Sequence, residues 1–261
     1  MLEDENSPAE QLPQRILPDG CAELIFNLGE PFEAQDEAGR WNLQPKEFLA
    51  GQIKGPLLVR PSGKTRIIGV RLRPYALHQG FGLPAEELAG SFTPLEFLLP
   101  KICILDQLGE AKSRPDAIAL LESALLSTVA DRPIQKGTVA ADVMIQADGG
   151  IPIKTVADAI GLSRRQLERR FKKEIGLSPK QFCRVLRFQK VFASLEGRDP
   201  AWPDVAAACG YYDQAHLIRD CRELSGETPS ALLSEETDLA EHFLKAGKVS
   251  HSYKTHKLRP S

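Results

Sequence analysis

An internal repeat in the last third of this 261-residue chain constrains its fold more than any other feature. Two groups of residues recur at nearly constant spacing: Val156, Ala157, Ile160 and Gly161 return as Val205, Ala206, Cys209 and Gly210, and Arg169, Gly176 and Pro179 return as Arg219, Gly226 and Pro229. The offset is 49 residues in the first group and 50 in the second, so one residue is added at the turn. Each copy has the order helix, glycine turn, helix and Gly-x-x-Pro exit, which is typical of a helix-turn-helix unit.

The first copy shows why this spacing suits two crossing helices. Val156 and Ile160 are one helical turn apart and point inward, while the small Ala157 lets the next helix cross closely. Gly161 permits a left-handed or tight backbone at the turn, and Ser163 is placed to cap the helix that follows. The pattern predicts a packed pair of helices.

The second helix of this copy, SRRQLERRFKKEIG, is strongly amphipathic. Its apolar stripe consists of Leu167, Phe171 and Ile175. Its opposite side carries Arg164, Arg165, Glu168, Arg169 and Lys172. Such a helix fits a DNA major groove, which is about 12 Å wide and in which arginine can bind guanine O6 and N7 through two hydrogen bonds.

Charge is distributed unevenly along the chain, although the net formal charge is only −2. Residues 1–148 contain 14 Lys and Arg against 21 Asp and Glu, a net charge of −7, whereas residues 149–233 contain 14 against 10, a net charge of +4. Residues 149–190 alone contain 11 basic and 3 acidic residues, a net charge of +8. A basic segment in an acidic chain indicates a polyanionic partner.

The N-terminal half has a different pattern. From residue 16 to 73, short β-favouring runs alternate with Gly, Pro, Asp and Ser, which predicts a small antiparallel sandwich or barrel. From about residue 84 to 132, apolar residues at three- and four-residue spacing predict a helical connector. We therefore predict an α+β chain with a β-rich domain at 1–132, a helical domain at 133–233 and a tail at 234–261.

Residues 138–233 resemble the DNA-binding domain of the AraC/XylS family of bacterial transcription regulators. The segments LSRRQLERRFKKEIGLSPKQFCRVLRFQ and YYDQAHLIRDCRELSGETP carry the likeness. It implies two helix-turn-helix subdomains joined by a linker helix at about Ser178 to Leu195, each placing one recognition helix in a major groove of double-stranded DNA. The base-reading positions that it implies are Arg165, Glu168 and Arg169 in the first helix and Gln214, Ala215 and Arg219 in the second.

Contacts to the DNA backbone are expected from other polar residues of the same domain. We predict phosphate contacts by Lys154, Arg164, Lys172, Lys180, Arg184, Arg187 and His216. The alternative for Glu168 is an ion pair with Arg164 or Lys172, and for His216 a packing or capping role. In the second copy, Cys221 replaces the aromatic side chain that Phe171 provides in the first, which predicts a less filled core and a softer subdomain.

The N-terminal stretch resembles the sensor region of one AraC-type subgroup through LPDGCAELIFNLG, FLAGQI and GVRLRPYALHQGFGLPAEELAG, and the tail segments DLAEHFL and VSHSYKT share that likeness. The likeness implies that this part binds a small-molecule effector or forms a homodimer. RNA polymerase is a further expected partner of the protein. Asp19, Glu23 and Asn27 lie at even separations, so on a strand they share one face, where they are candidates to line an effector pocket.

Several classes of function are disfavoured. His78 is the only histidine before His216, so the β-rich domain lacks the histidine cluster of a metal-dependent enzyme. The sequence has no G-x-S-x-G, H-E-x-x-H, phosphate-loop or dinucleotide-binding motif, so we predict no catalytic residue, metal or cofactor. The five cysteines form no C-x-x-C pair and are expected to be buried thiols. The chain contains neither a run of about 18 apolar residues nor a basic, apolar leader, so we expect a cytoplasmic protein with no membrane partner.

We therefore interpret the chain as a transcription regulator that is not an enzyme. It is expected to bind duplex DNA sequence-specifically and to respond to an effector through its N-terminal domain. An alternative is a ligand-binding or protein-interaction protein whose DNA-binding domain has weakened, as Ala215 and Cys221 suggest. An enzyme with a DNA-binding domain attached is a third interpretation, which the missing motifs disfavour.

Overall fold

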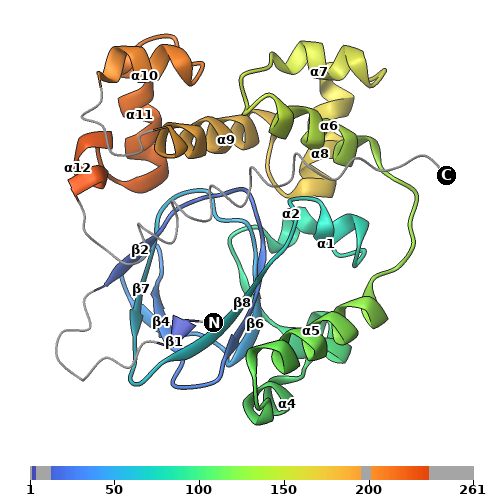
Figure 1. Ribbon diagram of the computed structural model, residues 1–261. Coiled ribbons are helices and arrows are strands. Elements are labelled where there is room, and N and C mark those ends of the chain that lie inside the picture. The colour runs from blue at the N-terminus through green and yellow to red at the C-terminus, as the bar shows by residue number, and fades with distance from the viewer. Residues whose placement is uncertain (1, 4–12, 195–200, 235–261) are drawn as a thin grey trace.

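The computed structural model describes residues 2–3, 13–194 and 201–234, and these form a β-rich part and a helical part. Figure 1 shows the strands gathered below, with the helical part lying across them as two clusters joined by one long helix. The predicted tail lies outside the described residues from position 235 onward, as does the predicted end of the linker helix at Leu195. The α+β class predicted from the sequence is confirmed.

The strands of the described residues form two antiparallel sheets, as the turn-rich pattern predicted. One sheet has the order β1-β8-β3-β6-β9 and the other has the order β2-β7-β4-β5. The strands are β1 (Leu2–Glu3), β2 (Gln14–Ile16), β3 (Glu23–Asn27), β4 (Phe32–Gln35), β5 (Trp41–Leu43), β6 (Glu47–Ala50), β7 (Leu57–Pro61), β8 (Arg66–Arg71) and β9 (Phe92–Pro94).

Strand β3 shows how the first sheet divides its two faces. Leu24 and Phe26 are fully buried in a core shared with the helices that follow the sheet, whereas Glu23, Ile25 and Asn27 point to the opposite face. Because side chains alternate along a strand, one sheet can pack on helices and also face the second sheet.

Helices occur between residues 84 and 128, within the segment 84–132 that was predicted to be helical, but one stretch of it is a strand. Phe92–Pro94 forms strand β9, which pairs with β6 through Phe92 and Ala50. The apolar spacing in SFTPLEFLL fits a helix, but Pro94 favours extended backbone in the residue before it, and the edge of β6 accepts the strand. The helices of this part are α1 (Ala76–Gln79), α2 (Ala85–Leu88), α3 (Leu95–Leu98), the 3-10 turn η1 (Pro100–Ile102), α4 (Leu105–Glu110) and α5 (Arg114–Thr128).

The C-terminal part consists of two helix-turn-helix units at the ends of helix α9 (Figure 1). The predicted local signals are present: Gly161 and Gly210 have positive φ angles of 63° and 76°, and Ser163 forms a capping box with Gln166. Its helices are α6 (Lys136–Gln146), α7 (Ile153–Ala159), α8 (Arg164–Ile175), α9 (Pro179–Ala193), α10 (Trp202–Ala208), α11 (Gln214–Ser225) and α12 (Pro229–Ser234).

The N-terminal part packs directly against both units and the helix between them. The loop before β3 contacts α9, where Gln189 donates a hydrogen bond of 3.0 Å to the Pro18 carbonyl oxygen and Gly20 lies against Phe182. Leu17 packs on the core of the second unit. On the other side, α2 meets the C-terminal end of α8 (Figure 1). The β-rich part therefore touches the elements that carry the predicted DNA-binding residues.

Candidate DNA-binding interface

Helix α8 presents its basic side to solvent because its apolar stripe is anchored in the first unit. Leu167 and Phe171 are fully buried, and the Phe171 ring lies 5.4 Å from that of Phe182 on α9. The face opposite this stripe is exposed, including the three predicted base-reading residues Arg165, Glu168 and Arg169. The geometry therefore leaves one solvent-facing surface on α8 that carries both arginines.

Two charged residues of this surface have partners within the protein. Arg164 Nε lies 3.1 Å from Glu168 Oε1, so the alternative assignment of Glu168 to an ion pair with Arg164 describes this structure. Lys172 Nζ lies 2.6 Å from Oε1 of Glu86 on α2. Both pairs are exposed, and such pairs contribute only about 0 to 1 kcal/mol to stability. They can therefore exchange for phosphate at little cost.

Helix α11 is the equivalent element of the second unit. It begins after Asp213, whose side chain accepts a hydrogen bond of 2.7 Å from the His216 backbone amide. Ala215 and Arg219 are exposed and Gln214 is half-buried. The His216 imidazole packs edge-on against the Tyr211 ring at 5.2 Å, so the packing alternative describes its environment.

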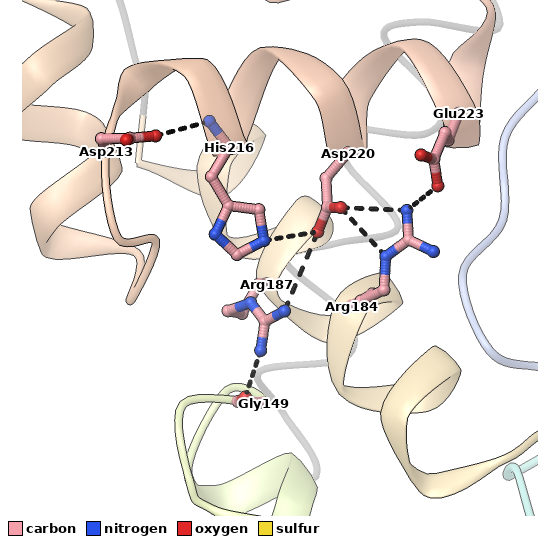
Figure 2. Close-up of polar contacts among 7 residues, drawn as sticks. All are labelled: Gly149, Arg184, Arg187, Asp213, His216, Asp220 and Glu223. Atoms are coloured by element: carbon pink, nitrogen blue, oxygen red, sulfur yellow. Dashed lines mark hydrogen bonds and ion pairs between the residues drawn. The ribbon is translucent and has the colours of Figure 1, made fainter.

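Arg184 and Arg187, predicted to contact phosphate, point into the protein instead. On α9, the Arg184 side chain is 21% exposed, and its Nε donates a hydrogen bond of 3.0 Å to Asp220 Oδ1 on α11. The Arg187 side chain is 16% exposed and donates a hydrogen bond of 3.0 Å to the Gly149 carbonyl oxygen. Figure 2 shows both side chains converging on Asp220. Their shared acidic partner, Asp220, lies 36 residues after Arg184 and 33 residues after Arg187, on a different helix. Sequence spacing gives no indication of such a contact.

The two remaining predicted phosphate residues are accessible. Lys154 is exposed on the first turn of α7, and Lys180 is exposed on the first turn of α9. A lysine at such a position places its charge beside backbone amides that also attract phosphate. These two side chains are therefore available for backbone contacts.

Two buried acidic residues were missed in the sequence. Glu174 is 4% exposed and accepts a hydrogen bond of 2.7 Å from the Gly137 amide at the start of α6, and Asp220 is 3% exposed. Both occupy positions of an apolar stripe, since Asp220 lies three residues after Leu217 and one before Cys221. An acidic residue within such a stripe requires a buried donor, and this signal could have identified both.

Cys221 lies in a core with more aromatic residues than its sequence position suggested. It is fully buried, and the same core contains Tyr211, Phe188 and Phe192. Burial raises the pKa of the Cys221 thiol to about 12, which keeps it uncharged. The relative softness of this unit stays a prediction.

The predicted effector residues are not all brought together. Arg71 on β8 lies 2.7 Å from Asp19 Oδ2 and 3.1 Å from Glu23 Oε1, so two of the three residues share one guanidinium group. Asn27, at the other end of β3, donates to the Pro45 carbonyl oxygen at 3.0 Å. The acidic pair therefore forms an ion cluster next to the loop that packs on α9.

Asp19 should make stability depend on pH. Burial raises the pKa of its carboxyl to about 6, although Arg71 opposes the shift. Between pH 4 and pH 6 the folded state then binds more protons than the unfolded state, so the free energy of unfolding falls as pH rises through this window. Asp19→Asn should remove a pH-dependent difference of about 2 kcal/mol between pH 4.5 and pH 7, out of about 3 kcal/mol over the whole titration window, measured by denaturant unfolding at these two pH values.

The matched control is Asp36→Asn. Asp36 is a partly exposed carboxyl whose pKa is lowered, chiefly by its hydrogen bond from the Arg40 backbone amide. This variant should keep the loss of stability between pH 4.5 and pH 7. If the free energy of unfolding of Asp19→Asn changes between pH 4.5 and pH 7 as much as that of the unaltered protein, Asp19 is not the source of the pH dependence.

Within the described residues, neither a metal site nor a membrane-spanning helix is present. No group of three or more His, Cys, Asp or Glu residues there has an arrangement that could hold a metal ion. No helix in the same ranges is long and apolar enough to cross a bilayer. All five cysteines are free thiols.

Comparisons with known proteins match both parts of the chain. Residues 156–235 match a family described as a helix-turn-helix domain, and residues 1–94 match a domain family of unknown function, DUF6597. The HTH-type transcriptional activator RhaS of Citrobacter koseri is 35% identical over 64 residues, which cover 24% of this chain and 23% of RhaS. The helix-turn-helix domain at residues 156–235 is of the AraC/XylS type. The aligned region thus spans less than a quarter of the curated relative.

The chain also shares its fold with a solved structure. A 1.65 Å resolution structure of ToxT from Vibrio cholerae matches with a TM-score of 0.50 and 10% identity, covering 85% of this chain and 96% of ToxT. At that identity the match shows a shared fold alone. An AraC/XylS helix-turn-helix domain and a β-rich N-terminal domain are therefore combined in one chain.

Proposed function

We propose that this protein is a transcription regulator that binds double-stranded DNA sequence-specifically through α8 and α11, in the cytoplasm. The observation that carries the proposal is the solvent-facing surface of α8, where Arg165 and Arg169 are exposed opposite a fully buried apolar stripe. A helix of this kind fits a major groove, and α11 repeats its position at the other end of α9.

We infer that the first unit provides most of the base recognition. Arg165 and Arg169 are one helical turn apart and can each bind a guanine edge, while Glu168 can accept from a cytosine amino group once Arg164 turns to phosphate. In α11, Arg219 is the corresponding arginine, Ala215 can contribute only a methyl contact, and Gln214 can bind adenine.

The proposed set of phosphate contacts is smaller than the sequence suggested. It consists of Lys154, Lys180 and Arg164, with Lys172 added when Glu86 releases it. Arg184 and Arg187 are engaged by Asp220, and the His216 ring packs on Tyr211, so we assign these three to internal packing.

Selection of genomic fragments tests this function directly. Purified full-length protein is incubated with fragmented bacterial DNA at moderate salt, and bound fragments are sequenced. We expect enrichment of a sequence with two adjacent segments on one face of the duplex. Failure to enrich any sequence would refute DNA reading and favour the alternative of a ligand-binding or protein-interaction protein with a weakened DNA-binding domain.

We further infer that the N-terminal domain controls DNA binding through its contacts with α8 and α9. Helix α2 meets the recognition helix itself, since the Ala85 carbonyl oxygen would lie 2.7 Å from a Cβ atom at Gly176. An effector acts on such a system by binding one interdomain arrangement more tightly than another. The ion cluster of Asp19, Glu23 and Arg71, next to the Gly20 contact with α9, places a polar group of the sensor domain at this boundary.

Glu86→Gln should strengthen DNA binding. The change releases Lys172 for phosphate and removes a negative charge beside α8, so we expect about 3- to 10-fold higher affinity at low salt. The slope of log affinity against log salt concentration should steepen by about one, because one more phosphate is neutralised. Fluorescence anisotropy with labelled duplex at several salt concentrations measures both quantities.

Glu87→Gln is the matched control. Glu87 is the exposed neighbour on the same short helix, so its removal changes net charge equally. We expect a smaller gain in affinity and no change in salt slope. If the two variants behave alike, Lys172 is not held back by Glu86.

A further inference from the structure

A buried ionic cluster joins the two helix-turn-helix units at the middle of α9. Its centre is the Asp220 carboxylate of α11, which is 3% exposed. Arg184 binds its Oδ1 atom through Nε at 3.0 Å and Nη2 at 2.9 Å. A carboxylate removed from water in this way requires positively charged partners. Here the two partners, Arg184 and Arg187, both come from the linker helix α9.

Arg187 extends the cluster to the first unit. Its Nη2 atom lies 3.8 Å from Asp220 Oδ2, and its Nη1 atom donates a hydrogen bond of 3.0 Å to the Gly149 carbonyl oxygen in the turn between α6 and α7. The same guanidinium lies 5.4 Å from the centre of the Tyr211 ring, which precedes α11. One side chain thus contacts both units, as Figure 2 shows for Gly149 and Asp220.

The two carboxylate oxygens of Asp220 have different partners. Oδ1 has hydrogen bonds from Arg184, whereas Oδ2 has no hydrogen-bond partner and lies 3.8 Å from Arg187 and 3.9 Å from His216 Nε2. Glu223 on the same helix also pairs with Arg184, but its side chain is 54% exposed. Asp220 is therefore the buried centre, and Glu223 lies at the rim.

The first recognition helix is fixed in another way. At the position equivalent to Asp220, α8 has Arg170, which is exposed. Leu167 and Phe171 of α8 make apolar contacts in the core of the first unit. The buried Glu174 of α8 accepts a hydrogen bond from the start of α6, within the same unit. Among the described residues, an ionic link to the linker helix thus fixes α11 but not α8.

We propose that Asp220 is a positioning residue that, through Arg184 and Arg187, sets the separation and angle between α8 and α11, and thereby the spacing between the two DNA segments that the chain reads. The proposal rests on the proposed function. Buried ionic groups can specify one arrangement among several that apolar packing alone would allow. The role lies in the spacing of the bound site, since Asp220 is too buried to touch a base.

The test uses full-length protein and the DNA site obtained by fragment selection. A series of duplexes carries the same two segments with one or two base pairs inserted or deleted between them. For the unaltered protein we expect affinity to fall at least about tenfold for each change of spacing, because one base pair rotates the second segment by about a tenth of a turn. For Asp220→Asn we expect affinities within about threefold of one another across the series, with the base preference inside each segment unchanged.

Two further variants make the result specific. Arg187→Gln keeps the Arg184 pair but removes the link to Gly149, so it should relax spacing as Asp220→Asn does, and it decides the question if Asp220→Asn fails to fold. Glu223→Gln is the matched control, since it removes an acidic partner of Arg184 at the rim and should keep the spacing preference.

The outcomes separate the two proposals. If the unaltered protein enriches no sequence, the proposed function fails. If it binds DNA but tolerates every spacing, or if folded Asp220→Asn and Arg187→Gln keep the original spacing preference, only the positioning role is overturned. Relaxed spacing in both variants with unchanged base preference supports it.

Discussion

Replacing both Arg165 and Arg169 with alanine is expected to lower affinity for the preferred DNA site at least about thirtyfold. Each arginine that reads a base through two hydrogen bonds contributes about 1 to 3 kcal/mol to discrimination, and both side chains are exposed on the same face of α8. Affinity for a scrambled duplex should fall much less, so the ratio of the two affinities is the decisive quantity. Fluorescence anisotropy at one fixed salt concentration measures it.

Two single variants separate base reading from charge. Lys180→Ala should weaken binding to preferred and scrambled duplexes alike and reduce the salt slope by about one, because a lysine on phosphate carries no sequence information. Arg114→Ala removes an exposed arginine at the start of α5, in the N-terminal part, and should leave DNA binding unchanged. Equal losses for both duplexes in the double arginine variant would contradict base reading by α8.

Gly149→Ala should destabilise the helical domain by about 2 to 5 kcal/mol. Gly149 has a φ of +71°, and a Cβ atom there would lie 2.2 Å from the Cys183 carbonyl oxygen of α9. The left-handed conformation costs a non-glycine residue about 1 to 2 kcal/mol, and forcing apart packed elements costs about 1 to 3 kcal/mol more. Urea unfolding followed by circular dichroism gives the difference in the free energy of unfolding.

Gly90→Ala isolates the backbone contribution to this loss. Gly90 has a similar φ of +79°, but a Cβ atom there meets nothing within 4 Å. This variant should lose about 1 to 2 kcal/mol from the left-handed conformation alone. A Gly149→Ala variant no less stable than Gly90→Ala would show that α9 can move away from the turn.

The repeat made the helical domain predictable because its signals are local. Ser163, Gly161 and the stripe of Leu167 and Phe171 act within a few residues of one another, and the structure has each feature where the sequence indicated it. The exposed face of α8 followed from the same periodicity. Solvent exposure of Arg165 and Arg169 could therefore be predicted from the amino-acid sequence alone.

Features that depend on partners far along the chain could not be predicted. The sequence favours a phosphate contact for Arg184, because its partner Asp220 lies 36 residues further along the chain. The spacing of Asp19 and Glu23 predicts that they line a pocket, but Arg71 on a neighbouring strand pairs with both. Periodicity shows which face a residue occupies, whereas the partner on that face depends on sheet order and domain packing.

Strand β9 shows the same limit for secondary structure. Its three residues follow a helical apolar spacing, and only pairing with β6 makes them a strand. Short segments have too few residues for their own periodicity to outweigh a sheet edge.

The contact of Leu17 with the second helix-turn-helix core also bears on the order in which the chain is made. Leu17 leaves the ribosome about 200 residues before α11, and domains generally fold as units in the order of synthesis. The sheet that presents Leu17 can thus be complete before Leu217 and Cys221 exist. The second unit can then close its core against a surface already in place, and in that order of folding the N-terminal domain acts as a template for α11.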